Sequence, residues 1–183
     1  MAFMTFMPAG NESEKWTNDE EHTRIGFEIR HAGLSWVSGR FTDYDIEVKG
    51  GEGNVEDIKV KVKVRTASIN TGVAPRDKHL RTKDFFYSEV YPEMTFESTR
   101  IEPLSPATGR LYGNLTIRDI TKPVVLYVEL LGKHESPITH KLTAGFRLRG
   151  VVNRADYKLG PGYVPATIAH DVHIVVDGEF AKD

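Results

Sequence analysis

Histidines and basic side chains are the groups in this sequence that could take part in binding or catalysis. The 183-residue chain has seven histidines and no cysteine, which excludes thiolate nucleophiles, disulfides and cysteine-ligated metals. His31 continues the alternating apolar positions Ile25, Phe27 and Ile29, so a strand here would turn it toward the core. The position predicts either a core histidine bonded to a backbone carbonyl or a polar anchor at the mouth of a cavity.

The other polar motifs indicate neither a catalytic site nor a metal site. His170 and His173 are three residues apart in an alternating segment, so on a strand they face opposite ways and cannot bind one metal. Ser35 lacks the glycine two residues later that a nucleophile elbow needs. The GPG at residues 160–162 opens no helix that could hold a phosphate. The sequence therefore predicts no metal and no catalytic residue.

The stretch TGVAPRDKHLRTKDFF, residues 71–86, interrupts the alternating pattern. Pro75 suits the first turn of a helix and Asp77 is favoured there, which predicts a short helical insert at about 75–91. Several aromatic residues end the insert. Placed between two strands, it could cap an open end of a barrel or act as a plug that completes the core.

Elsewhere the chain alternates apolar and polar residues, as strands do when one face lies in a core. The clearest case is residues 58–65, where Ile58, Val60, Val62 and Val64 alternate with lysine and arginine. Comparable segments lie near residues 25–31, 44–48, 94–101, 111–117, 124–130, 142–148 and 172–176. The pattern predicts an all-β fold, a barrel or sandwich of about eight antiparallel strands.

A barrel of about eight strands can either be filled by side chains or hold one slender ligand. Gly113 and Ala144 occupy inward positions of the predicted strands. Such small residues could leave room along the axis, or they could accommodate bulky neighbours. Both a ligand-holding tunnel and a solid core remain open on this pattern.

Composition and length suggest one ordinary globular domain. The net charge of −2 and the 39% of hydrophobic residues show no basic excess, so we expect no nucleic acid partner. We predict a flexible arm over residues 1–15 and one domain over 16–183.

The opening MAFMTFMPAG lacks the basic start of a signal peptide. It predicts a cytoplasmic protein if the chain is full length and a periplasmic one if a leader was removed. No apolar run approaches the roughly 20 residues of a membrane-spanning helix, so we expect no integral membrane segment.

Several longer motifs occur together in one order: FEIRHAGLSWVSGRF, RDKHLRTKDFF, YPEMTFEST, GRLYGNLTIRDITKPVVL and AHDVHIVVDGEF. From Trp16 onward, the chain resembles the YceI family of polyisoprenoid-binding, lipocalin-like proteins. The resemblance implies an elongated antiparallel barrel with a helical insert, whose tunnel holds a long isoprenoid or acyl chain. Asp119 and Tyr157-Lys158 depart from the family pattern at turns. A homodimer is common among proteins of this kind.

With the resemblance, the sequence predicts a protein that binds, stores or transports an apolar lipid, without chemistry and with no required cofactor. The lipid would be a polyisoprenoid, an isoprenoid quinone or a fatty-acid derivative. The residues expected at its headgroup are His31, Arg76, His79 and Arg81. Those expected along the hydrophobic tunnel are Phe27, Ile29, Phe41, Phe85, Phe86, Phe96, Leu115, Leu126 and Phe146.

Two alternatives remain beside lipid carriage. One is an enzyme that acts on a lipid headgroup through His31, Arg76, Asp77 and His79 as acid-base groups. The other is an interaction module with a solidly packed barrel and a working outer surface.

Overall fold

A computed structural model describes residues 15–51 and 54–183. Within these ranges the chain forms one α-helix, α1 (Ala74–Leu80), and three short 3-10 helices, η1 (Val55–Asp57), η2 (Thr66–Ser68) and η3 (Arg154–Tyr157). The strands are β1 (Lys15–Asn18), β2 (Arg24–His31), β3 (Ser35–Phe41), β4 (Tyr44–Lys49), β5 (Lys59–Arg65), β6 (Ile69–Asn70), β7 (Glu93–Pro103), β8 (Thr108–Ile117), β9 (Ile120–Glu135), β10 (Leu142–Asn153) and β11 (Ile168–Lys182). The predicted all-β class with a short helical insert is confirmed.

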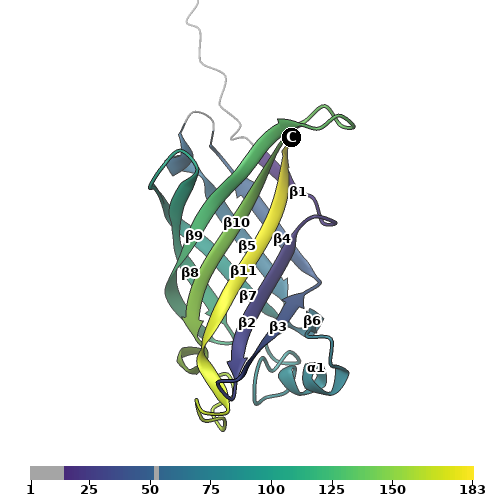
Figure 1. The fold of residues 1–183 in the computed structure, drawn as a ribbon, viewed down its shortest axis with the longest axis vertical. Helices are drawn as coiled ribbons and strands as arrows, with labels where there is room; N and C mark the ends of the chain where they lie inside the picture. Colours follow the sequence, from purple (N-terminus) through teal and green to yellow (C-terminus); the bar gives the residue numbers. More distant parts are fainter. Residues whose placement is uncertain (1–14, 52–53) are drawn as a thin grey trace, which may run out of the picture.

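The strands form one antiparallel sheet that closes on itself (Figure 1). Strands β4, β5, β7, β8, β9, β10 and β11 follow one another, and β1 pairs with both β4 and β11 to complete a ring of eight. Further along β11, β2 takes the place of β1 and carries β3 and β6 at its side. The predicted eight-stranded barrel is therefore confirmed.

The inward face of the barrel follows the predicted alternation. In β5 the valines are partly or fully buried and face the core, whereas Lys59, Lys61 and Lys63 are exposed. β-Branched side chains suit such a pleated, half-buried surface, so this strand forms where its pattern predicts it. At the far end of β10 the pattern fails, because Leu142 is 40% exposed.

Three strands were absent from the sequence prediction: β1, β3 and the two-residue β6. The short β1 begins at Lys15, the last residue of the predicted arm, and residues 1–14 lie outside the described residues. Strand β3 also escaped prediction because SWVSGRF has a weak apolar alternation. It forms through its pairing with β2, from Ile25 opposite Phe41 to His31 opposite Ser35.

Helix α1 and the turns after it lie at one end of the barrel, beside β3 and β6 (Figure 1). Pro75 stands in the first turn of α1, where its missing N–H is tolerated. The connection between β10 and β11 lies at the same end. In this connection Lys158 ends η3 with a left-handed φ of 55°. Glycine adopts this conformation most easily, so the departure from the family pattern at Tyr157-Lys158 falls on a turn that would favour glycine.

No helix in residues 15–51 and 54–183 is long and apolar enough to cross a membrane.

Candidate ligand-binding cavity

A cavity of about 620 Å³ runs through the inside of the barrel. Strands β2, β3, β4, β5, β7, β8, β9, β10 and β11 all contribute apolar side chains to its wall. Val55, Pro103 and Ala107 line it at one end, and His31, His79 and Tyr163 line it at the α1 end. The volume lies within the range of small-molecule sites, so the barrel is not a solidly packed core.

The cavity exists because large side chains fold down over glycines. Ring atoms of Phe96 occupy the space that a side chain at Gly113 would take, since a Cβ there would lie 2.4 Å from the ring. Phe27 covers Gly39 in the same way. Both alternatives raised by the small inward residues therefore apply: Gly113 accommodates a bulky neighbour, and the axis stays open. Ala144, the other residue of that kind, is fully buried and does not line the cavity.

The structure places every residue expected along the tunnel on the cavity wall. The wall includes Phe27, Ile29, Phe41, Phe85, Phe86, Phe96, Leu115, Leu126 and Phe146. They come from β2, β3, the insert, β7, β8, β9 and β10. Because they lie far apart in sequence, barrel closure is what brings them to one surface.

The insert forms the floor of the cavity. Phe86 packs against Phe41 with ring centroids 5.6 Å apart, and Phe85 lies 5.6 Å from Tyr163 of the β10–β11 connection. The Gly160 N–H donates to the carbonyl of Asp84 at 2.6 Å, which joins the insert to that connection. Open volume remains above these rings, so the insert is a cap and not a plug.

Arg76 reaches the cavity wall from α1, held by Thr71. Its Nε donates to the Thr71 hydroxyl at 2.7 Å, and the hydroxyl donates to a carboxylate oxygen of Asp77 at 2.5 Å. Asp77 is 7% exposed and also accepts the Thr71 amide, and it does not line the cavity. The carboxylate thus orients Arg76 through a hydroxyl.

The other three residues expected at the headgroup are placed differently. His79 lines the cavity, packs edge-on against Phe85 at 5.3 Å and lies 3.3 Å from a carboxylate oxygen of Asp84. His31 lines the cavity at the exposed end of β2, so it is not a buried core histidine. Arg81 is exposed, donates to the Ile69 carbonyl and does not line the cavity.

Arg154 is a cavity residue that the sequence analysis did not select. Its side chain is 3% exposed, and all its donors are used by five backbone carbonyls, those of Leu159, Gly160, Tyr163, Ile168 and Ala169. Burial lowers the pKa of its guanidinium below the usual range. Periodicity gives no signal for such a residue, because its partners are main-chain atoms of a loop and of the start of β11. Its charge nevertheless adds to the positive end of the cavity.

The family model of the YceI-like domain matches residues 16–180. The chain belongs to the YceI family. It is 38% identical to the UPF0312 protein plu2095 of Photorhabdus laumondii over 86% of this chain and 81% of that protein. Among solved structures, the YceI protein of Campylobacter jejuni aligns with a TM-score of 0.78 at 33% identity, covering 91% of this chain and 97% of the other.

A more distant YceI-fold structure is a polyisoprenoid binding domain from Saccharophagus degradans. It aligns with a TM-score of 0.64 at 14% identity, covering 92% of this chain and 98% of the other. At that identity the likeness shows the fold. The predicted family and barrel architecture are confirmed by these comparisons together with the sheet topology.

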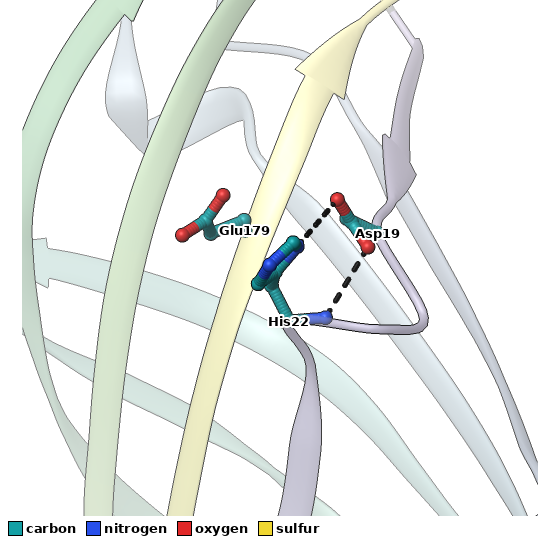
Figure 2. Close-up of side chains that lie close together, drawn as sticks. All are labelled: Asp19, His22 and Glu179. Carbon is teal, nitrogen blue, oxygen red and sulfur yellow. Dashed lines mark hydrogen bonds and ion pairs between the residues drawn. The ribbon is translucent and has the colours of Figure 1, made fainter.

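Outside the YceI cavity, Asp19, His22 and Glu179 bring possible metal-ligating atoms within 4.8 Å of one another (Figure 2). No spacing in the sequence marks these three residues, because β11 brings Glu179 from far along the chain. Asp19 and His22 are exposed and already bonded: His22 Nδ1 lies 2.8 Å from one Asp19 oxygen, and the other accepts two backbone amides. These hydrogen bonds shape the turn between β1 and β2.

Replacing Arg154 should destabilise the fold more than replacing an exposed arginine of the same strand region. We expect Arg154→Leu to lower the free energy of unfolding by about 3 kcal/mol or more, because several buried carbonyls lose their donor. Arg149→Leu is the control and should change it by about 0.5 kcal/mol or less. Urea denaturation measures both, and equal losses would contradict the structural role of Arg154. Arg154→Lys should not restore stability, since an ammonium lacks the planar fork.

The Asp19–His22 contact predicts a shifted titration. The hydrogen bond and charge of Asp19 raise the pKa of His22 above its usual 6.5, and the same bond lowers the pKa of Asp19 below 3.8. The contact therefore stabilises the fold fully below pH 6.5 and loses this effect as the pH rises through the raised value. At the acid end it is lost as the pH falls through the lowered pKa of Asp19.

An NMR titration of the His22 ring checks this shift. In Asp19→Asn the pKa of His22 should fall toward 6.5, whereas Glu179→Gln should lower it less because Glu179 acts only through its charge. An unchanged His22 titration in Asp19→Asn would show that the contact does not form in solution.

Proposed function

We propose that this YceI-family protein binds a long apolar lipid in its barrel and stores or carries it without chemical change. The lipid would be a polyisoprenoid, an isoprenoid quinone or a fatty-acid derivative. The observation that carries the proposal is the continuous cavity of about 620 Å³ with an apolar wall. The related fold of a polyisoprenoid binding domain from Saccharophagus degradans supports it.

The apolar chain can supply most of the binding free energy. Burying one methylene contributes about 0.8 kcal/mol, so ten chain carbons would contribute roughly 8 kcal/mol before ordering costs. A narrow barrel lined by aromatic and branched side chains suits such a chain better than a compact polar metabolite.

A polar or anionic headgroup would lie at the α1 end, where basic side chains on the cavity wall are more numerous than at the opposite end, which carries Lys133. Arg76, His79 and His31 line this end, and the buried charge of Arg154 adds to the positive potential. A headgroup buried without a partner is costly, so these side chains favour one orientation of the lipid. Arg81 is left out of this proposal because it lies off the cavity wall.

The arrangement of polar groups favours binding over catalysis. Asp77, a candidate acid-base group, is buried against Thr71 and lies off the cavity wall. A lipid incubated with the protein should be recovered with unchanged mass. A new mass, absent with a His31→Ala, His79→Ala variant, would favour an enzyme.

A tryptophan inside the barrel should block the lipid. Leu115 points into the cavity from β8, and its neighbour Asn114 points outward and is exposed. We expect Leu115→Trp to weaken binding of the fluorescent fatty acid cis-parinaric acid by about tenfold or more while the protein stays folded. Asn114→Trp is the matched control and should bind as the unchanged protein does.

Circular dichroism and thermal unfolding accompany that measurement. In a solid core Leu115→Trp would overpack and destabilise the protein by about 1 to 3 kcal/mol. Equal fatty-acid binding by the two tryptophan variants would contradict the proposed tunnel.

A charge-specific test locates the headgroup. Arg76→Gln should weaken binding of a long-chain fatty acid by about tenfold or more, because a hydrogen bond to a charged group is lost. Binding of the alcohol with the same chain should not change. Arg81→Gln, on the same insert but away from the cavity, is the control. Equal loss for acid and alcohol would place the headgroup elsewhere.

A further inference from the structure

We infer that the α1 end of the barrel docks on an anionic lipid bilayer, and that the bound lipid enters and leaves through this end. The inference rests on the proposed function for the identity of the cargo. The docking surface itself is defined by Leu34, Val73, Val164 and the exposed lysines Lys78 and Lys83.

Exposed apolar side chains stand on neighbouring turns at this end. Leu34, in the turn between β2 and β3, is 87% exposed, and Val164, in the β10–β11 connection, is 60% exposed. The two turns are joined by a hydrogen bond from the Ala32 N–H to the Thr167 carbonyl at 2.8 Å. Val73, just before α1, is 45% exposed. Exposed apolar side chains that do not pack in the core can insert into a bilayer at the boundary between headgroups and acyl chains.

Apolar exposure alone does not choose between the two ends of the barrel. Ile138, in the β9–β10 connection at the other end, is 88% exposed. The net charge around α1 distinguishes the two ends. The segment 73–84 has four basic residues and two acidic residues, so its net charge is +2, and the rest of the chain carries −4 against a total of −2.

The basic side chains of the segment are available to a surface. Of the two acidic residues, Asp77 is buried against Thr71 and Asp84 lies 3.3 Å from His79 Nε2, whereas Lys78 and Lys83 are exposed. Neither lysine forms an ion pair with a carboxylate in residues 15–51 and 54–183. Basic residues around apolar tips favour an anionic bilayer, which attracts the charge and accepts the tips.

The cavity reaches this same surface. His31 and Arg30 line the cavity next to the Leu34 turn, and His79 lines it from α1. The floor is made of two separate segments, the insert and the β10–β11 connection, joined by the Gly160–Asp84 hydrogen bond. A lipid that leaves a bilayer at this point would pass from acyl chains into the barrel without crossing water.

Vesicle sedimentation of the full chain tests the docking. Vesicles of phosphatidylcholine mixed in equal parts with phosphatidylglycerol should bind the protein, and vesicles of phosphatidylcholine alone should not. Leu34→Glu with Val164→Glu should weaken binding by about tenfold or more, because each tip then carries a repelling charge. Ile138→Glu, a change at an equally exposed position of the opposite end, should leave binding intact.

A charge-reversed pair gives a second measurement. Lys78→Glu with Lys83→Glu should weaken vesicle binding by about tenfold or more, and added salt should weaken binding of the unchanged protein. Lys59→Glu with Lys141→Glu, exposed positions away from α1, is the control. No binding to the anionic vesicles, or equal binding by the test and control variants, would overturn the inference. If this end instead binds a protein, the anionic vesicles should not bind it.

Binding of the lipid itself is measured separately from docking on vesicles. cis-Parinaric acid delivered from ethanol should bind the Leu34→Glu, Val164→Glu variant as it binds the unchanged protein, while transfer from anionic vesicles should slow by about tenfold or more. If the unchanged protein does not bind cis-parinaric acid at all, the proposed function fails, and the vesicle result still decides the docking. If it binds and vesicle transfer does not slow, the docking inference fails alone.

Discussion

Closure of the sheet is the constraint on which the rest of this structure depends. The short β1 pairs with β4 on one side and with β11 on the other, so the ring is left without free edges there. Once the ring closes, every second side chain of each strand must point to the axis, and the sequence supplies apolar residues at those positions. Because Phe27 and Phe96 fold over glycines of neighbouring strands, the axis stays open and the inward faces enclose a cavity.

The α1 end is where this regularity stops. Here β3 pairs with β6 instead of continuing beside β5, and the insert and the β10–β11 connection close the space between them. Such loops need internal partners, which Arg154 provides by donating to three carbonyls of its own connection and to two at the start of β11. The same end therefore combines a rigid frame with positive charge, while the remaining cavity wall is almost entirely apolar.

That asymmetry separates two roles in lipid binding. The apolar wall would set the strength of binding, since it removes the chain from water whatever the headgroup is. The cationic end would set the direction in which the lipid lies, because an ionised headgroup is stabilised there and strongly disfavoured along the rest of the barrel. Under the proposed function, a protein built this way would accept lipids of different chains and hold them in one orientation.

The sequence by itself determined the barrel, the insert and the lining. Alternation at β5, β8, β9 and β11 marks the inward face directly, because a strand turns every second side chain the same way. The tunnel residues on predicted strands lie on the cavity wall for this reason, whereas Phe41, Phe85 and Phe86 were expected from their positions in the family pattern. Local chemistry likewise located α1, through Pro75 and the interrupted alternation.

Only the tertiary structure decided which polar groups meet. Asp77 acts on Arg76 through Thr71, and Arg154 bonds to backbone carbonyls, relations that no spacing rule contains. Glu179 reaches Asp19 and His22 across the sheet for the same reason. Whether small inward residues leave space was also undecided, because that depends on how Phe96 lies over Gly113. The alternation of a strand determines which face of the sheet a side chain lies on, whereas the packing of distant segments determines which side chains it contacts.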